Sequence, residues 1–193
     1  RWSSENWGAR HLYCPACSSP AVERLPNNTE ARDFECPACG HFFQPKSRSV
    51  WSVTTVPDAA YDAMMAAVRS DTAPSLLVLQ YTAAWLVWNL LLVPHFFLTP
   101  SAIKKRPPLA AGARRAGWVG CNISLANIPA DGKIMVVTDG AVVQPTEVRK
   151  RFQSVKPVAS LDVSLRGWTL DVLNIVRGLA KERFTLDEVY ASA

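Results

Sequence analysis

The pattern of apolar residues changes sharply in the middle of the chain. Between Thr72 and Ile103 no Asp, Glu, Lys or Arg occurs. Two leucine- and valine-rich segments of this run, Leu76–Thr82 and Trp88–Val93, are separated by a short apolar turn region, which predicts two buried strands. The core of the run, Leu76–Leu98, is also long enough to span a bilayer as a helix. Internal polar residues and a proline near its end favour the strands, and we expect no membrane partner.

Helices are predicted on either side of this run. Pro57–Arg69 carries apolar residues at every third or fourth position, with Asp58 in its expected first turn. Pro145–Phe152 is a candidate for a short helix. Trp168–Leu179 carries an apolar stripe, which predicts a helix packed against a core. Phe184–Tyr190 has acidic residues near its start, which is typical of the first turns of a capped helix.

Further strands are predicted in both halves of the chain. A strand is expected around Ala31–Cys36, and Phe42–Lys46 reads as the strand that returns beside it. Lys133–Val137 and Val142–Val143 flank the turn Asp139–Gly140, a pattern typical of a hairpin. Strands with flanking helices predict an α/β domain.

Length and composition agree with a folded domain. The chain has 193 residues, of which 49% are apolar, so it can bury a core and is not a disordered segment. Its formal net charge of +5 suits a nucleic acid or another anionic surface, but does not distinguish between them.

Four of the five cysteines form two matched pairs. Cys14 and Cys17 enclose Pro-Ala, as do Cys36 and Cys39, and eighteen residues separate the pairs. Two C-x2-C turns are typical of a tetrahedral zinc site with four thiolate ligands, which leaves no position open for a substrate. Redox or disulfide cysteines are the alternative, but the double spacing favours structural zinc. Zinc needs thiolates, so we expect a reduced, cytoplasmic location; the remaining Cys121 is expected to pack as a small buried hydrophobe.

A candidate catalytic group lies inside and beside the cysteine pairs. Asp33 stands three residues before Cys36, and Gln44 and Lys46 follow the second pair on one predicted strand, where both face the same side. Hydrolysis of a phosphodiester needs a divalent metal held by oxygen ligands, and benefits from a nearby cation. Taken alone the pattern is weak, because an Asp and a Lys near zinc turns are most often surface charge. His41 is expected at the surface.

A basic stretch is the third candidate for function. The proline-, alanine- and arginine-rich segment Thr99–Gly120 predicts a surface loop. Arginines bind phosphates or guanine edges, and an aromatic side chain can wedge against bases. A solvated loop with its tryptophan in the core is equally compatible with the sequence. The candidate DNA-binding residues are Lys104, Lys105, Arg106, Arg114, Arg115 and Trp118.

Six segments, in the same order along nearly the whole chain, match a known family. They are Tyr13–Cys17, Asp33–Cys36, Lys46–Arg48, Ala60–Met65, Arg114–Ile123 and Arg166–Trp168. On these segments the sequence resembles the DpnI-like family of methyl-directed type II restriction endonucleases, which includes the Dam-replacing proteins. The resemblance implies a PD-(D/E)xK nuclease core, a mixed sheet flanked by helices, with an inserted four-cysteine zinc site. It also implies a C-terminal winged-helix domain, and double-stranded DNA with N6-methyladenine in GATC as the substrate.

The resemblance also assigns residues. Asp33, Gln44 and Lys46 fall on the catalytic positions, and the Mg²⁺ ligands would be Asp33, Gln44 and the carbonyl of Pro45. Gln44 departs from the pattern, which usually has a carboxylate there; Glu35, on the same strand face as Asp33, is a possible substitute. A methyl group on adenine favours a shallow apolar pocket, because it forms no hydrogen bond, and Trp118 is our candidate for one wall of that pocket.

The expected organisation is a nuclease domain at residues 1–183, with the zinc site at 13–40, and the start of a winged-helix domain at 184–193. We expect a monomer without a small-molecule substrate. Two other hypotheses stay open at this point. Because Gln44 carries no charge, the chain is alternatively a methyl-adenine DNA-binding module that does not cut. The run Leu76–Leu98 would suit a membrane-associated zinc protein.

Overall fold

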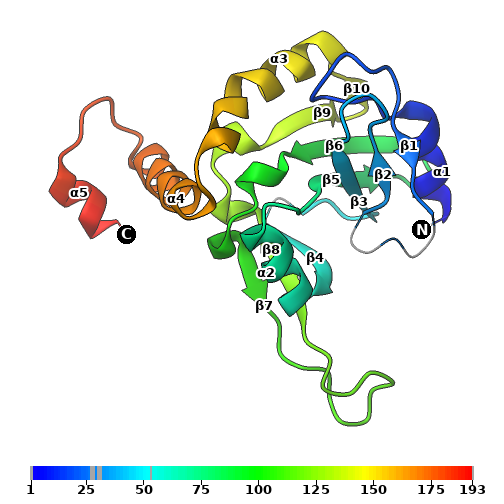
Figure 1. The fold of residues 1–193 in the computed structure, drawn as a ribbon, viewed down its shortest axis with the longest axis horizontal. Coiled ribbons are helices and arrows are strands. Elements are labelled where there is room, and N and C mark those ends of the chain that lie inside the picture. The colour runs from blue at the N-terminus through cyan, green and yellow to red at the C-terminus, as the bar shows by residue number, and fades with distance from the viewer. Residues whose placement is uncertain (1, 27–28, 30–31, 53, 193) are drawn as a thin grey trace.

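The part of the chain that the structure describes forms two β-sheets and five α-helices (Figure 1). The structure is a computed structural model, and it describes residues 2–26, 29, 32–52 and 54–192. The fold is mixed α/β, as predicted. Helices pack around a curled, mostly antiparallel larger sheet, and a smaller sheet continues from one end of it.

Among the described residues, the larger sheet has seven strands in the order β1-β2-β3-β5-β6-β9-β10, and only β3 and β5 run parallel in it. The two central strands are the predicted buried pair, which explains why neither alternates apolar with polar residues. The expected strand around Ala31–Cys36 is shortened to β2, and Ala31 lies outside the described residues. The strands are β1 (Glu23–Arg24), β2 (Phe34–Glu35), β3 (Phe42–Arg48), β5 (Ser75–Tyr81), β6 (Val87–Val93), β9 (Ile134–Thr138) and β10 (Ala141–Val142).

The predicted hairpin near the end of this sheet is confirmed. Asp139 and Gly140 join β9 to β10 with φ angles of 49° and 79°. Two consecutive positive φ values suit a tight hairpin turn whose twist matches that of the flanking strands.

The smaller sheet has the order β4-β8-β7, from β4 (Thr55–Ala60), β8 (Gly120–Ser124) and β7 (Ile103–Lys105). The predicted helix start at Pro57 is therefore wrong: Pro57–Ala60 is strand, and α2 covers only Tyr61–Arg69. Val56 and Asp58 are buried while Thr55 and Pro57 are exposed, which is the period of a strand. Proline is tolerated because β4 is an edge strand.

The other helices are α1 (Trp2–His11), α3 (Pro145–Val155), α4 (Val163–Leu179) and α5 (Leu186–Ala191), with short 3₁₀ turns at His95–Phe97, Pro100–Ala102, Leu125–Asn127, Ala130–Gly132 and Lys156–Ser160. Of these helices, α1 and α3 pack against the larger sheet, while α4 and α5 follow at the C-terminal end of the chain. Helix α3 packs along β9. The predicted capped helix near residue 184 is confirmed as α5, where Thr185 and Glu188 form a capping box.

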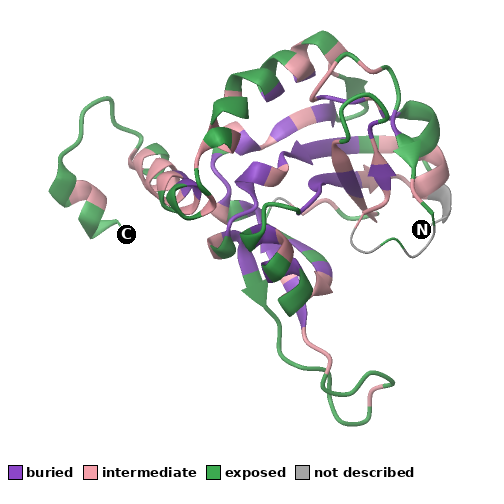
Figure 2. Cartoon of the chain, in the orientation of Figure 1, coloured by how far each residue is buried: buried purple, intermediate pink, exposed green. Residues whose placement is uncertain are grey.

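The apolar stripe of α4 is less buried than predicted. Leu170 is fully buried, but Leu173, Val176 and Leu179 are only partly covered. Figure 2 shows the reason: only the first part of α4 lies against the body of the protein, and the rest of α4 and α5 extend away from it.

The core lies between the larger sheet and its covering elements. Its largest fully buried side chains include Phe34, Phe43, Phe96 and Phe152. The run Thr72–Ile103, which contains no charged residue, forms the central strands β5 and β6 and two 3₁₀ turns of this core. Among the described residues, no helix combines the length and the apolar character needed to cross a membrane.

Candidate functional site

The four paired cysteines meet at one point. The Sγ atoms of Cys14 and Cys39 lie 3.7 Å apart, and those of Cys17 and Cys36 lie 3.6 Å apart. All four sulfurs lie within 4.8 Å of one another, and all are free thiols. A tetrahedral Zn²⁺ with thiolates at about 2.3 Å needs sulfur–sulfur separations of about 3.8 Å, whereas a disulfide needs about 2.05 Å. The cluster therefore has the geometry to hold zinc and not the geometry of two disulfides.

Backbone and side-chain hydrogen bonds fix the cysteine turns. Gly40, at φ 68°, donates its N–H to the carbonyl of Cys36 at 2.9 Å, and Ser19 donates its N–H to the Cys17 sulfur at 3.4 Å. From α3, Arg149 donates to the carbonyls of Cys14 at 3.1 Å and Ser19 at 2.8 Å. The first turn is thus attached to the body of the protein independently of any metal.

A polar cleft of about 790 Å³ lies between the larger and smaller sheets and brings the predicted catalytic residues together. Gln44, Pro45 and Lys46 line it from β3, and Asp33 lines it from just before β2. The N–H of Asp33 donates to the carbonyl of Phe43 at 3.1 Å, so the β2–β3 pairing sets the position of Asp33 beside Gln44.

The cysteine cluster and the cleft share this strand pair. Cys36 directly follows β2, and its N–H donates to the carbonyl of His41 at 2.9 Å, just before β3 begins. A metal that links Cys36 and Cys39 to the first cysteine pair would therefore hold the end of the hairpin that carries Asp33 and Gln44.

Two expectations about neighbouring residues need correction. Glu35 is not among the described residues that line the cleft, and its carboxylate lies on the side of Gly40 instead. His41 is not a surface residue: its Nε2 lies 2.7 Å from the Ser75 hydroxyl, and its ring packs against His95. Burial lowers the pKa of His41 to about 4, and the nearby His95 acts in the same direction.

Asp58 also lines the cleft, and sequence reasoning missed it. Its carboxylate, on β4, forms an ion pair with the ammonium of Lys46 on β3. The sequence predicts the first turn of a helix here, where an acidic residue needs no further explanation. The strand period of this segment is seen only in the structure, where Val56 and Asp58 are buried and Thr55 and Pro57 are exposed.

Cys121 lies behind Asp58 in the smaller sheet, where the two residues are register partners. It is fully buried, as predicted, and its thiol donates to the carbonyl of Ala59 at 3.4 Å. Burial raises the pKa of Cys121 to about 11, and the negative charge of Asp58 acts in the same direction. The thiol is therefore protonated at neutral pH and is no candidate nucleophile.

The basic residues lie beyond the smaller sheet. Lys104 and Lys105 are exposed on β7 rather than in a loop. Arg106, Arg114 and Arg115 are exposed on the excursion between β7 and β8, which extends away from the body (Figure 2). None of the predicted DNA-binding residues is among the described residues that line the cleft. Strands β7 and β8 nevertheless connect the excursion to β4, and so to Asp58.

Trp118 sits at the base of this excursion and is partly buried. The guanidinium of Arg115 lies 4.7 Å from the centre of its ring. A Cβ on Gly120 would stand 2.7 Å from ring atoms of Trp118, so this close packing requires a glycine at position 120. Trp118 is therefore neither free in solvent nor part of the core.

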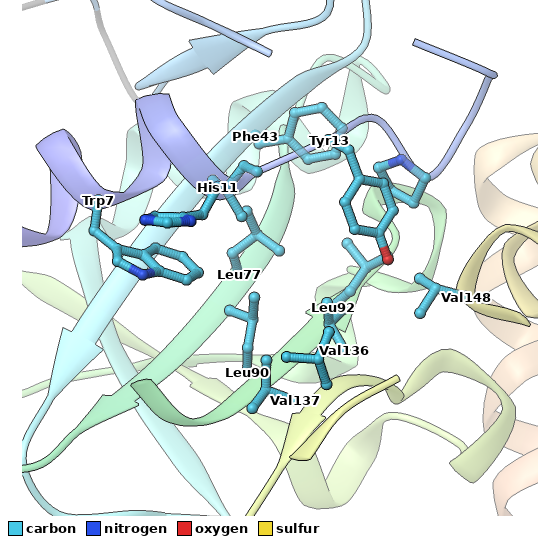
Figure 3. Close-up of a pocket in the computed structure, with 13 residues that line it drawn as sticks. Trp7, His11, Tyr13, Phe43, Leu77, Leu90, Leu92, Val136, Val137 and Val148 are labelled. Carbon is cyan, nitrogen blue, oxygen red and sulfur yellow. The ribbon is translucent and has the colours of Figure 1, made fainter. Parts of the chain in front are cut away.

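A second, apolar pocket of about 190 Å³ lies on the other face of the larger sheet (Figure 3). Phe43 and Leu77 line it from the sheet, together with Trp7, Tyr13 and Val148. Neighbouring residues of a strand point to opposite faces, so Phe43 faces this pocket while Gln44 faces the cleft. The described lining offers no carboxylate, and the pocket is not where phosphodiester chemistry would occur.

The fold and the cleft define a mixed α/β protein with a four-cysteine cluster and a charged cleft on one sheet face. The chain belongs to the Dam-replacing (DpnI) family, whose sequence model matches residues 1–161. This is a family of restriction endonucleases, which act on DNA. The match ends before α4.

Proposed function

We propose that the chain is a type II, methyl-directed restriction endonuclease that cleaves double-stranded DNA at GATC containing N6-methyladenine. The observation that carries the proposal is that Asp33, Gln44, Pro45 and Lys46 line one cleft. A carboxylate, an amide oxygen, a backbone carbonyl and an ammonium form the donor set of a PD-(D/E)xK site, and β3 would be the central strand of such a core.

The donors suit a hard divalent cation. The carboxylate of Asp33, the side-chain oxygen of Gln44 and the carbonyl of Pro45 would hold Mg²⁺, which prefers oxygen ligands. When bound, Mg²⁺ lowers the pKa of coordinated water and neutralises charge on the phosphate. The Lys46 ammonium would orient the attacking water and stabilise the negative charge that develops on the phosphate oxygens.

The cysteine cluster would hold zinc with a structural role. Four thiolates complete its coordination, so it offers no position for substrate. Binding would contribute folding free energy to the β2–β3 hairpin, because the preformed site does not exist in the unfolded chain.

DNA contacts would come from the exposed basic residues on β7 and between β7 and β8, in the same sheet as Asp58. Lys104, Lys105, Arg106, Arg114 and Arg115 would contact phosphates or guanine edges. Trp118 would offer an apolar surface to the adenine methyl group, which has no hydrogen bond to offer. Residues 1–183 would form the nuclease domain, and α5 within 184–193 would begin a winged-helix domain.

The test is a digest of two plasmids, one from a host that methylates GATC and one from a host that does not, in the presence of Mg²⁺. We expect cleavage of the methylated plasmid only, with ends that map to GATC. Lys46→Ala should lower the cleavage rate at least about 10²-fold. Lys150→Ala, which removes an exposed lysine from α3, is the matched control and should cut normally. Failure of the wild-type protein to cut methylated DNA would reject the proposal.

Gln44 supports a second candidate, a methyl-adenine reader that binds without cutting. An amide in the ligand position carries no charge, so it holds Mg²⁺ less strongly than a carboxylate would. The reader predicts specific binding to methylated duplex without cleavage by the wild-type protein. In that case Gln44→Glu should create or strengthen cleavage, whereas in an active nuclease it should mainly lower the Mg²⁺ concentration required.

A further inference from the structure

One carboxylate beside the cleft is fully withdrawn from solvent. The side chain of Asp58 has an exposed fraction of 0%, whereas that of its partner Lys46 is 23% exposed. Apart from Lys46, no described residue offers a hydrogen bond to either carboxylate oxygen of Asp58. A buried charge without a partner is strongly unfavourable, so Lys46 is what makes an ionised Asp58 tolerable at this position.

The pair also joins the two sheets. Lys46 lies on β3 of the larger sheet, and Asp58 lies on β4 of the smaller one. The β4–β8 pairing is irregular between Asp58 and Ala60. Irregularities of this kind re-aim side chains and are common beside active sites. Here the irregularity begins at Asp58, the residue whose carboxylate pairs with Lys46.

A direct role for Asp58 in metal binding does not fit this geometry. Both of its oxygens are shielded from solvent, so a hydrated cation in the cleft does not reach them. Lys46, by contrast, lines the cleft with a partly exposed side chain while its ammonium pairs with the Asp58 carboxylate, so Lys46 is the member of the pair that a ligand in the cleft would meet.

We propose that Asp58 is a positioning residue that holds the Lys46 ammonium at the edge of the cleft. This inference rests on the proposed nuclease function, in which Lys46 stabilises the phosphate. A free lysine side chain samples many rotamers, and the ion pair restricts it to one. Asp58 does not touch the DNA. It acts through Lys46, from the smaller sheet that also carries the basic residues.

The first test is single-turnover cleavage of methylated duplex with saturating Mg²⁺. Asp58→Asn keeps the shape of the side chain and removes its charge. We expect its cleavage rate to fall about 10²-fold, as for a misplaced catalytic group, while its Kd for methylated DNA changes less than about threefold. In a Lys46→Met background, Asp58→Asn should have no further effect, because the two residues act as one unit. Asp58→Glu should restore part of the rate.

The matched control breaks another ion pair of the fold. Asp71 accepts two hydrogen bonds from the buried Arg166, at 2.6 and 3.0 Å, and is not among the residues that line the cleft. Asp71→Asn should lower the Tm and leave the cleavage rate at 25 °C unchanged. The comparison of Asp71→Asn with Asp58→Asn therefore separates the general effect of losing an ion pair from the specific effect of losing the one at Lys46.

The second test does not depend on cleavage. Acylation of lysines by an amine-reactive ester, followed by peptide mass spectrometry, reports how available each amine is. Lys46 should react several-fold faster in Asp58→Asn than in the wild type, while the exposed Lys150 reacts equally in both. Unchanged reactivity of Lys46, or wild-type cleavage by folded Asp58→Asn, would overturn the positioning role. A wild-type protein that does not cut methylated DNA would reject the nuclease function. The role of Asp58 in catalysis would then be rejected as well, even if the labelling still showed that Asp58 pairs with Lys46.

Discussion

At the scale of single residues, some of the side chains that line the cleft can be predicted from local spacing in the sequence and others cannot. Gln44 and Lys46 stand two positions apart on a strand, and this spacing alone predicts that they share a face. Asp58 gives no such local signal. It lies on β4, which pairs with β8 from much later in the chain, and its partner Lys46 lies on a strand of the other sheet. The role of Asp58 therefore depends on contacts between segments that are far apart in the sequence, and a pattern of a few neighbouring residues cannot predict such contacts.

Trp118 carries a prediction that belongs to this scale. If its ring forms the wall for the methyl group, Trp118→Ala should reduce the preference for methylated over unmethylated duplex. One buried methyl group is worth about 0.8 kcal/mol, or roughly fourfold in Kd. Fluorescence anisotropy with matched methylated and unmethylated duplexes measures the ratio. Trp168→Ala, which removes a tryptophan exposed by 66% on α4, is the control. An unchanged ratio, with a wild-type Tm, would remove Trp118 from the methyl pocket.

At the scale of elements, the β2–β3 hairpin depends on the cysteine cluster that closes its end. Cys36→Ser should lower the bound zinc to well below one equivalent and unfold the hairpin, because metal binding and folding of such turns are coupled. Cleavage should then be lost. Zinc analysis and hydrogen exchange of β2 and β3 are the measurements. Cys121→Ala, which changes a buried thiol outside the cluster, should keep its zinc. Full cleavage by a zinc-free Cys36→Ser protein would contradict the structural role.

Helix α3 makes a separate contribution to the same cluster. Arg149 donates two hydrogen bonds to carbonyls of the first cysteine turn. Arg149→Met keeps much of the side-chain length but loses these donors, and should cost about 1–3 kcal/mol because carbonyls are left unpaired. It should also speed the removal of zinc by a chelator. Lys150→Met, on the exposed side of α3, is the matched control. Equal rates of zinc removal in the two variants would show that α3 does not support the cluster.

The elements also show what the sequence does and does not predict. The buried strands β5 and β6 and the β9–β10 hairpin follow from composition and turn residues over short windows. The paired cysteines follow from the same kind of local signal. The segment 57–60 was wrongly predicted as helix because apolar spacing continues into α2. The partial burial of α4 was missed because an apolar stripe does not reveal how much of its length another element covers.

At the scale of the whole molecule, two partly buried histidines lie close to the ion pair that Asp71 forms with Arg166 of α4. His95 packs beside His41, and the charges that act on it are those of Asp71 and Arg166. Burial lowers the pKa of His95 below its usual value; among the weaker influences, Asp71 raises it and Arg166 lowers it. The folded protein therefore favours neutral His95 at a pH where the unfolded chain is already protonated.

The sign of the pH dependence follows from this difference. Below about pH 6.5, the ordinary pKa of histidine, the unfolded state binds a proton at His95 that the folded state takes up less readily. Stability should therefore fall as the pH is lowered from 7 toward 5. His95→Gln removes the titrating group, so its Tm should fall less between pH 7 and pH 5 than that of the wild type.

Asp71 titrates in a different range and so serves as the internal comparison. The hydrogen bonds from Arg166 lower the pKa of the Asp71 carboxyl, so its contribution persists above the usual aspartate pKa of about 3.9 and is lost only below it. Asp71→Asn should therefore lower the Tm at both pH 7 and pH 5, and somewhat more at pH 5, because it also removes the charge that raises the pKa of His95. Protonation of the cysteine thiolates affects the wild type and His95→Gln alike, so the difference between these two proteins reports on His95. An equal loss of Tm in the wild type and His95→Gln would show that His95 is not the group that links stability to pH.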